Sequence, residues 1–398
     1  MEEWPLSENV GQAVIAGVRD LLPVLRDRAQ ETEDAREVPA ESVKALEQTG
    51  FFRLLQPARF GGHEADPITF LTAVKLIASA CGSTGWVSSV IGVHPWQLAL
   101  FPLRAQEEVW GADSGTRMSS SYAPTGRADA VAGGHQLSGR WSFSSGCGHA
   151  TWVLLGGIVL DADGNPADFR TFLLPASDYV IDDVWDTVGL RGTGSNDIVV
   201  AGAFVPEHRS LSFTDITRCA CPGQEANPAP LYRLPYGSVF SCAITTSIIG
   251  MAVGAYDAHV TYQRERVRAA YTGQKAAQDP FAQVRVAQAA AELDSAWLAL
   301  EHNMAELTGH ARAGEKIPIP LRLRVRRDQV RGTGQAIGAV DLLFENSGGR
   351  ALKTGTPIQR FWRDAHAGRV HAINDPERAL SMFGRGEFGL DVPPDAML

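Results

Sequence analysis

Hydrophobic residues change their spacing twice along this chain of 398 residues. Up to about residue 115 they recur every three or four positions, which is the period of an amphipathic helix. From about residue 116 to 212, short apolar runs such as TWVLLGGIVL are separated by turn clusters such as DADGNPAD, and this texture predicts strands. From about residue 235 onward, long Ala-rich helical segments return.

The pattern predicts an α+β protein with domains at 1–115, 116–212 and 213–398. A chain of this length exceeds what one hydrophobic core usually serves. The strands follow one another instead of alternating with helices, which excludes a doubly wound parallel sheet. No repeat of roughly 20–50 residues is present, so the pattern also excludes a solenoid.

Composition narrows the class of partner. The net charge of −9 argues against nucleic acid and against an anionic membrane surface. The most apolar window, CAITTSIIGMAVGAYDAHV, contains several polar residues and indicates a buried helix rather than a membrane span. Five cysteines, an odd number, and an acidic N-terminus without a signal-peptide pattern predict a cytoplasmic protein with reduced thiols. Cys219 and Cys221 lack a second cysteine pair, so we expect no metal site.

Three motifs have ordinary explanations. GRGEFG at 384–389 matches the letters G-x-G-x-x-G, but too few residues follow for the helix of a dinucleotide site, so we expect a C-terminal turn. His366 and His371 are five residues apart, whereas a helical zinc pair needs a spacing of four. The arginines of LRLRVRRDQVR spread around their helix and predict a solvated or subunit-contacting face.

Two serine-rich stretches interrupt the β texture. They are SSSYAPTG at 119–126 and WSFSSGCGHATW at 141–152. Hydroxyls and backbone N–H groups in such stretches can face a ligand that stacks on the sheet, and ordinary Ser-Gly turns are the alternative. Neither stretch contains G-x-S-x-G, which argues against a serine hydrolase.

The stretch FWRDAHAGRVHAINDPE at 361–377 predicts one helix that carries both of its histidines. Its small residues, among them Gly368, would let a bulky group approach the backbone. A seven-residue spacing puts Asp364 and His371 on one face with Gly368 between them. A core histidine bonded to a carbonyl is the alternative for either ring.

The α–β–α order, the serine-rich stretches, YQRERVRAAYTG at 262–273 and SGGRALKTGTPIQRFWRDAHAG at 347–368 together resemble the acyl-CoA dehydrogenase superfamily. The resemblance covers essentially the whole chain. It implies an N-terminal helical domain, a central β-barrel and a C-terminal four-helix bundle with a tail, arranged as a homotetramer that binds flavin.

One departure decides the implied reaction. The dehydrogenases commonly carry a proton-abstracting Glu after the RD pair, whereas here Ala372 takes that position and His371 lies beside it. A neutral imidazole suits a phenol O–H better than a weakly acidic C–H. The chain is therefore similar to the oxygenase components of two-component phenol monooxygenases. CGSTGWVSSVIGVHPWQLALF, SSSYAP, GLRGTGSN and RFWRDAHAGRVHAINDPERA resemble those that act on a secosteroid phenol.

This resemblance implies ortho-hydroxylation of a bulky phenol with O2 and reduced FMN, FADH2 remaining open. A separate NAD(P)H-dependent reductase would supply the reduced flavin. Three alternatives remain: a hydroxylase of another phenol, an acyl-CoA dehydrogenase or oxidase, and a non-catalytic flavin-binding protein.

The resemblance also implies roles for single residues. Ser144 would hydrogen-bond flavin N5, His371 would deprotonate the phenol, and His94 would contact the substrate. Arg266, or alternatively Arg268, would pair with the flavin phosphate of a neighbouring subunit. The other residues implied at the flavin are Trp86, Ser120, Ser121, Tyr122, Phe143, Ser145, Gly349 and Arg350. For Trp86, an ordinary place in the core is the alternative.

Overall fold

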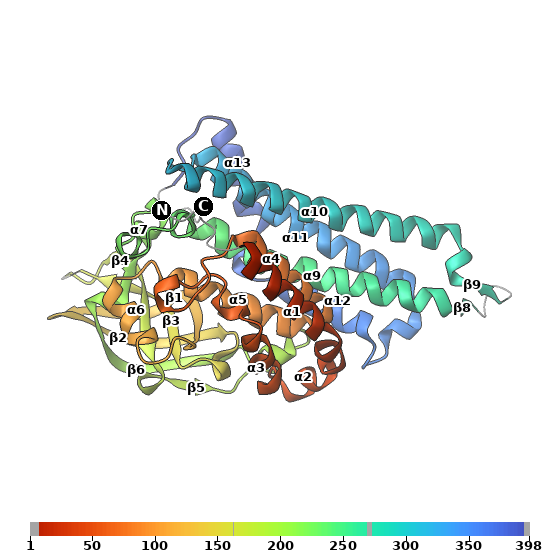
Figure 1. Cartoon of the computed structure of the whole chain (residues 1–398), viewed down its shortest axis with the longest axis horizontal. Coiled ribbons are helices and arrows are strands. Elements are labelled where there is room, and N and C mark those ends of the chain that lie inside the picture. The colour runs from red at the N-terminus through yellow and green to blue at the C-terminus, as the bar shows by residue number, and fades with distance from the viewer. Residues whose placement is uncertain (1–7, 162, 269–272, 394–398) are drawn as a thin grey trace.

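The computed structural model describes residues 8–161, 163–268 and 273–393. Figure 1 shows a β-sheet at one end of the molecule and long C-terminal helices that extend to the other end, with the N-terminal helices packed between them. The helices share one large hydrophobic core, whereas the sheet has a second core of its own. The architecture therefore joins two helical regions through a central sheet.

The N-terminal region is helical and contains the most deeply buried short helix of the fold. Its helices are α1 (Glu8–Asp27), α2 (Ala29–Ala35), α3 (Ala40–Gln48), α4 (Pro67–Ala80), α5 (Gly82–Leu98) and α6 (Leu103–Trp110). Every residue of α5 is buried, because α4, α9 and β1 pack around it. Polar side chains on such a helix need hydrogen-bond partners, which makes α5 a natural place for a polar site.

The central sheet is mixed and has seven strands in the part of the chain that the structure describes. They are β1 (Met118–Val131), β2 (Gly134–Ser144), β3 (Trp152–Leu160), β4 (Pro166–Pro175), β5 (Val180–Asp182), β6 (Asn196–Pro206) and β7 (Ser210–Ser212). Their order is β5-β6-β2-β1-β3-β4-β7, with β1 parallel to β3 and the other pairs antiparallel. Within the described residues no ladder joins β5 to β7, so the hydrogen-bonded sheet is open where the resemblance implies a barrel.

The C-terminal region contains the longest helices. They are α7 (Phe213–Arg218), α8 (Gly223–Ala226), α9 (Tyr236–Glu265), α10 (Pro280–Ala313), α11 (Ile319–Ser347), α12 (Pro357–Arg369) and α13 (Pro376–Glu387). A small ladder of β8 (Val267–Arg268) and β9 (Gln274–Lys275) lies between α9 and α10. Helices α9, α10 and α11 pack on one another, and α12 packs against α9 and α11.

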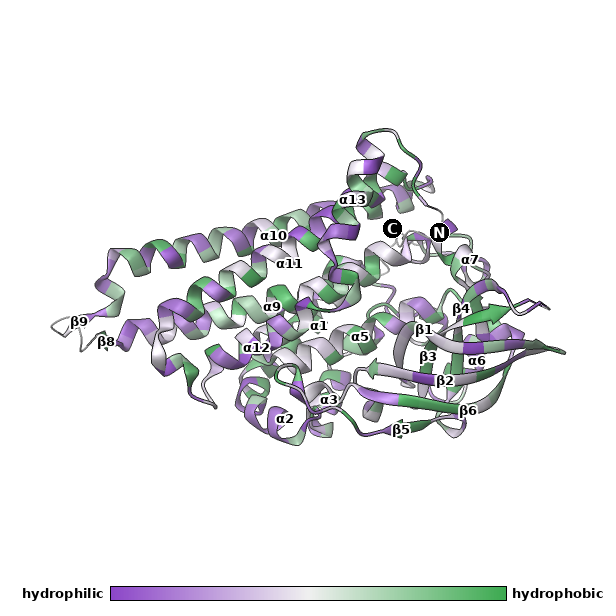
Figure 2. Cartoon of the chain, turned by 180° about the vertical axis from the view of Figure 1, so that it is seen from behind, coloured by the Kyte–Doolittle hydropathy of each residue, from purple (hydrophilic) through white to green (hydrophobic). Residues whose placement is uncertain are grey.

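Helix α9 is the central helix of this region. It is long and apolar enough to cross a membrane, but 94% of its most apolar window is buried inside the protein. A helix that is apolar all round is expected in a core, and α4, α5, α11 and α12 supply that surrounding. Hydrophilic residues instead recur along α10 and α2 (Figure 2).

The structure changes two predictions for the C-terminal segment. Helix α12 ends at Arg369, and the separate 3-10 turn η11 (Ala372–Asn374) follows, so His366 and His371 do not share a helix. The turn expected at 384–389 is confined to residues 388–389, since α13 continues to Glu387. Asp375 caps α13 through its side chain and Pro376 occupies the first turn, a common way to start a helix.

Candidate active site

A row of buried hydroxyls lies where β1 and β2 run side by side. The Ser144 hydroxyl donates to Ser119 Oγ at 3.1 Å, and both residues are fully buried. Two hydroxyls joined by one hydrogen bond retain a second O–H hydrogen that can be donated to a third group. Ser121 differs, because its hydroxyl donates to the Ser142 carbonyl at 2.7 Å and is used within the sheet. Ser120 is partly exposed.

A hydrogen-bond chain connects Trp86 on α5 to the loop before β6. Trp86 Nε1 donates to Ser145 Oγ at 3.1 Å, Ser145 bonds Ser195 at 2.7 Å, and Ser195 bonds Thr193 at 2.6 Å. Thr193 then donates to the Leu190 carbonyl at 2.8 Å. An indole N–H only donates and a carbonyl only accepts, so each hydroxyl in the chain accepts a hydrogen bond from the Trp86 side and donates one toward the Leu190 carbonyl. The chain therefore fixes both Trp86 and Ser145.

Phe143 lies beside these serines in an unusual backbone conformation. Its φ is +70°, and its side chain is 67% exposed and meets Trp185 edge-to-face, with ring centroids 6.0 Å apart. A positive φ is costly for an aromatic residue and tends to occur at functional positions. The result is an exposed Phe143 ring, backed by a half-buried Trp185, beside a buried row of hydroxyls.

His371 lies at the turn between α12 and α13. It is the N-cap of η11, and its Nδ1 accepts the Ile373 N–H at 3.2 Å. The ring lies between Trp86 and Phe240, with centroid separations of 5.8 and 6.3 Å. Burial, followed by the nearby Arg326 guanidinium, lowers the pKa of His371 to about 4. The imidazole is therefore neutral at physiological pH.

The turn that carries His371 is tied to the interior of the helical bundle. Arg326 on α11 donates to the Ile373 carbonyl at 2.9 Å. Asn374 donates to the Gly368 carbonyl at 3.0 Å and accepts from Gln329 Nε2 at 2.7 Å. Gln329 and Asn374 are both buried. These contacts hold the turn from both sides.

The prediction of a solvated or subunit-contacting arginine face on α11 is wrong for two of its members, which are buried within the chain itself. Arg322 and Arg326 are each only 7% exposed. Burial lowers the pKa of Arg326 to about 10, and within the described residues no carboxylate forms an ion pair with it. The sequence signal was the four-residue spacing of these two arginines on one helix face, between apolar residues that also point inward.

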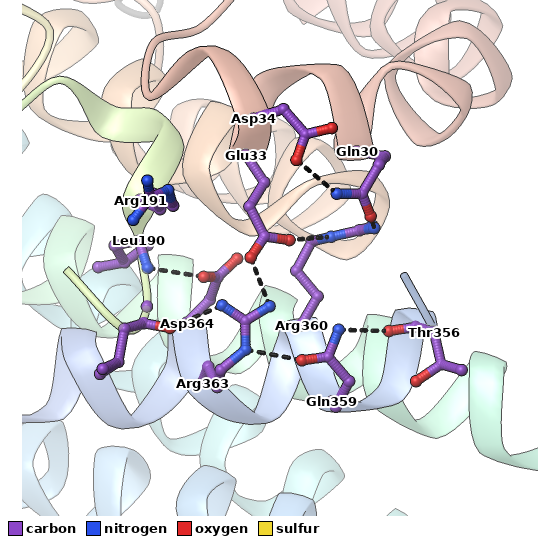
Figure 3. A network of polar contacts seen from close by, with 12 residues as sticks. Gln30, Glu33, Asp34, Leu190, Arg191, Thr356, Gln359, Arg360, Arg363 and Asp364 are labelled. Carbon is purple, nitrogen blue, oxygen red and sulfur yellow. Dashed lines mark hydrogen bonds and ion pairs between the residues drawn. The ribbon is translucent and has the colours of Figure 1, made fainter. Parts of the chain in front are cut away.

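Helix α12 is fixed by a polar network that Figure 3 shows. Glu33 on α2 pairs with Arg360 at 2.9 Å and Arg363 at 2.5 Å. Asp364 accepts the Leu190 N–H at 2.6 Å and is almost fully buried, which raises the pKa of its carboxyl to about 6. The network joins α2, α12 and the loop before β6, so the helix that precedes His371 has a defined position.

The small residues of α12 serve packing more than ligand access. A side-chain carbon added at Gly368 would come within 2.9 Å of the Trp86 ring and 3.1 Å of Ile248. Gly368 therefore lets α12 approach Trp86, so the bulky group at its backbone is an indole of the protein itself. His366 points elsewhere: it stacks on Trp362 with centroids 4.4 Å apart and lies 3.3 Å from Asp341.

His94 belongs to a buried polar cluster on α5. The Tyr122 hydroxyl donates to Gln97 Oε1, and His94 Nδ1 lies 3.4 Å from that hydroxyl. Tyr122 has one hydrogen and gives it to Gln97, so His94 Nδ1–H is the donor in the second contact. His94 Nε2 is then a bare acceptor, buried and without a protein partner among the described residues. Burial lowers the pKa of His94 to about 3, so it stays neutral.

Arg266, Gly349 and Arg350 lie together at the opposite end of α9. Arg266 donates to the Asn346 carbonyl at 3.0 Å and approaches Gly348, while Gly349 and Arg350 are exposed. Arg266 follows Phe240 by 26 residues along α9, about 39 Å at roughly 1.5 Å per residue. One small ligand cannot contact both ends within one chain. The Arg268 side chain lies outside the described residues.

The side chains present fit a flavin. The polar edge of an isoalloxazine carries both donors and acceptors, and the Ser119–Ser144 pair and the chain through Ser145 offer hydroxyls of both kinds. The exposed ring of Phe143 provides an apolar surface for the rest of the tricycle. Sequence reasoning missed Ser119, Ser195, Arg326 and Asn374, since their roles depend on neighbours distant in sequence.

Comparison with known proteins identifies first the fold family of the chain and then the group of enzymes within it. Residues 12–113 match the family described as acyl-CoA dehydrogenase, N-terminal domain, and residues 242–376 match acyl-CoA dehydrogenase, C-terminal domain. The chain is 60% identical to the flavin-dependent monooxygenase, oxygenase subunit HsaA, of Rhodococcus jostii (strain RHA1), over 94% of this chain and 97% of that one. It therefore belongs to the flavin-dependent monooxygenase oxygenase subunits that have the acyl-CoA dehydrogenase fold.

Two further relatives agree with this assignment. The oxygenase subunit HsaA of Mycobacterium tuberculosis (strain ATCC 25618 / H37Rv) is 54% identical over 99% of each chain. The crystal structure of 3-HSA hydroxylase from Rhodococcus sp. RHA1 superimposes with a TM-score of 0.93 at 58% identity, covering 97% of this chain and 99% of that one. The expectation of a flavin-dependent monooxygenase oxygenase component is thereby confirmed.

Proposed function

We propose that this oxygenase hydroxylates a bulky phenol ortho to its hydroxyl group, converting a secosteroid phenol to its catechol. The observation that carries the proposal is that one indole joins the two halves of the site. Trp86 donates to Ser145, next to the Ser144 hydroxyl, and its ring meets His371 edge-on. A hydroxyl row suited to a flavin and a neutral imidazole suited to a phenol thus border the same side chain.

Reduced FMN, with FADH2 as the alternative, supplies electrons that activate O2 for transfer to the aromatic ring. Ser144 holds a proton at flavin N5 by hydrogen bonding. Ser120, Ser121, Tyr122, Phe143 and Ser145 line the ring system through backbone and side-chain contacts. Trp86 packs beside it and excludes water from the space in front of His371.

The substrate is recognised at two polar points on an otherwise aromatic wall. His371 acts on the phenol oxygen, since its neutral ring lies between Trp86 and Phe240. The sequence suggested that this ring removes the phenol proton, but Nδ1 already accepts the Ile373 N–H. His94 contacts the substrate through Nε2, a bare acceptor suited to a hydroxyl.

The flavin phosphate is bound by Arg266, assisted by Gly349 and Arg350, in a neighbouring subunit of a homotetramer. Support comes from the span of about 39 Å between the two ends of α9, which no single flavin bridges. A separate NAD(P)H-dependent flavin reductase supplies the reduced cofactor, and the protein works in the cytoplasm.

The direct test mixes purified protein with photoreduced FMN, O2 and the secosteroid phenol, and analyses the product by mass spectrometry. We expect a catechol with one added oxygen. Simpler phenols run in parallel define the substrate class, and no catechol from any of them would refute the proposal.

An acyl-CoA dehydrogenase or oxidase, the main rival from the sequence, predicts protein that purifies with oxidised FAD bleached by an acyl-CoA. We expect colourless protein that prefers reduced flavin. A non-catalytic flavin-binding protein would bind reduced flavin without consuming any phenol.

A further inference from the structure

We infer that Arg326 is a positioning residue that fixes His371 as a neutral hydrogen-bond donor through Nε2. The inference rests on the proposed function for the identity of the group that His371 meets. It goes beyond that function in naming the ring atom, its protonation and the residue that sets both.

The tautomer of His371 follows from its cap contact. Nδ1 accepts the Ile373 N–H at 3.2 Å, and a ring nitrogen that accepts a hydrogen bond carries no proton. In the neutral ring the proton is therefore on Nε2. No protein group within the described residues partners Nε2, so its N–H is available to a ligand.

Arg326 controls the residue that supplies this cap. It donates to the carbonyl of Ile373, the residue whose N–H binds His371. On the other side of the turn, Asn374 donates to the Gly368 carbonyl. Burying a guanidinium without a carboxylate partner costs folding free energy, so a buried Arg326 is expected to have a specific structural role. Holding Ile373 in place through the peptide unit that follows the donating N–H is a task that the geometry supports.

The charge of Arg326 also keeps the ring neutral. After burial, Arg326 is the group that lowers the pKa of His371. The other neighbours of the ring, Trp86 and Phe240, carry no charge. Cys242 on α9 faces Arg326, and burial raises the pKa of its thiol to about 12, so it is neutral too. The cation therefore disfavours an imidazolium and favours an anion in front of Nε2.

The consequence is a changed role for His371 in the hydroxylation. The phenol loses its proton to bulk water before it enters the site and binds as the phenolate, and Nε2–H then donates to the phenolate oxygen and favours this ionised form. His371 takes up no proton. An ionised phenol has the higher electron density that ring hydroxylation requires, so a donor serves the reaction as well as a base would.

The first test is nitrogen NMR of histidine-labelled protein without flavin or phenol, with the His371 signals assigned from the His371→Gln variant. We expect a protonated Nε2 and a bare Nδ1. In Arg326→Gln both neutral tautomers of His371 should be populated. The midpoint of the His371 titration should rise by about one pH unit, because the nearby cation is removed. Arg326→Lys keeps the charge and should retain the low midpoint, with partial mixing of tautomers.

Arg322→Gln is the matched control, because Arg322 is equally buried one turn earlier and donates to the Thr217 carbonyl. It should leave the His371 signals unchanged. Protonation at Nδ1 in the unaltered protein would overturn the inference, and so would identical His371 signals in the two Gln variants. If Arg326→Gln fails to fold, Arg326→Lys is compared with Arg322→Lys. The two neutral tautomers of His371 should mix in Arg326→Lys and not in Arg322→Lys, and equal signals in both would overturn the inference. None of these readouts depends on hydroxylation, so they stand even if the proposed function fails.

The second test separates a donor from a base during turnover. Gln at position 371 provides an N–H but cannot take up a proton. If His371 is a donor, His371→Gln should hydroxylate at least about tenfold faster than His371→Ala, the range expected for one hydrogen bond to a charged group. Equal rates in the two variants would contradict the donor role.

Discussion

The two ends of α9 differ in a way that separates two tasks. Near Phe240, helix α5, strands β1 and β2 and the η11 turn bring buried hydroxyls and two neutral histidines together within one chain. Near Arg266, which is itself half-exposed, Gly349 and Arg350 are exposed, whereas Gln263, Asn346 and Ser347 are buried. Gly348 has a φ of +69° there. The first end is enclosed by its own chain, whereas the second presents charge outward.

This contrast has a physical basis. Excluding water requires many elements around one space, and the Phe240 end receives them because α5, α9 and the sheet meet there. Binding a phosphate requires cations that solvent and ligand can reach, and the far end of the bundle provides them. The resemblance assigned the Arg266 end to the flavin of a neighbouring subunit, and the span of about 39 Å between the two ends of α9 supports that proposal.

The largest expected effect breaks the enclosed end. His371→Ala removes the imidazole proposed to meet the phenol oxygen, and hydroxylation should fall by roughly 10²–10⁴, the range for a positioned proton-transfer or hydrogen-bonding residue. Flavin binding should stay nearly unchanged. The measurement is catechol formed per reduced flavin oxidised, with hydrogen peroxide as the uncoupled product. Raising the pH toward the pKa of the phenol should restore part of the rate.

His366→Ala is the control for this variant, because His366 lies on the outer side of α12 against Trp362 and Asp341. It should remain coupled. Wild-type rates in His371→Ala, or lower thermal stability with full coupling in the folded fraction, would identify His371 as an ordinary core residue.

Ser144→Ala should have the next largest effect. The hydroxyl is buried beside Ser119, and losing its hydrogen bond should reduce the yield of catechol per O2 by about 10- to 100-fold. Unlike His371→Ala, it should release hydrogen peroxide quickly even without a phenol. Ser138→Ala on the same strand is the control, since Ser138 lies on β2 opposite Arg127, away from the hydroxyl row. Equal peroxide release in the two variants would remove Ser144 from the site.

Arg266→Gln tests the open end. Removing one charged contact to a phosphate should weaken reduced-flavin binding by about tenfold, measured by fluorescence titration, while the rate at saturating flavin stays close to normal. Arg264, exposed two residues earlier, is a matched control, and Arg264→Gln should bind normally.

Co-expression sharpens this comparison further. If the two ends serve one flavin in different chains, an assembly of Arg266→Gln with His371→Ala contains some sites with both residues intact. Such sites should recover up to about half of the normal rate at low flavin concentration. No recovery in verified mixed assemblies would mean that Arg266 acts within its own chain or not at all.

Acid should produce the smallest and most gradual effect. Burial lowers the pKa of His94 to about 3 and of His259 and His371 to about 4. The unfolded chain therefore binds more protons than the folded one between about pH 6.5 and 4, and the free energy of unfolding should fall by up to about 1.4 kcal/mol per pH unit for each histidine. Asp364, whose pKa is raised to about 6, changes the free energy of unfolding in the opposite direction as the pH falls, and so offsets the effect of one histidine.

Urea unfolding at several pH values measures this slope, and His94→Gln should flatten it. A free energy of unfolding that rises as the pH falls from 6.5 to 4 would show that other groups dominate.

Local sequence determined the kinds of element. The change from helical spacing to short apolar runs predicts the β region, and all strands of the large sheet lie between Met118 and Ser212. The RD stretch and the serine-rich stretches identified the family because their residue types recur together. Such information is local, since propensity and spacing act over a few residues.

The tertiary structure decided which residues meet. By its spacing alone, Arg326 is one of several arginines on a solvated or subunit-contacting face, but α9 and η11 cover it. Gly368 is predicted to admit a bulky group, and only the fold identifies that group as Trp86. The tautomer of His371 depends on a helix that ends at Arg369, two residues before it, and on a peptide held from α11. Sequence determined the chemical groups, whereas burial and long-range hydrogen bonds decided their protonation, direction and partners, because these depend on neighbours that only folding brings close.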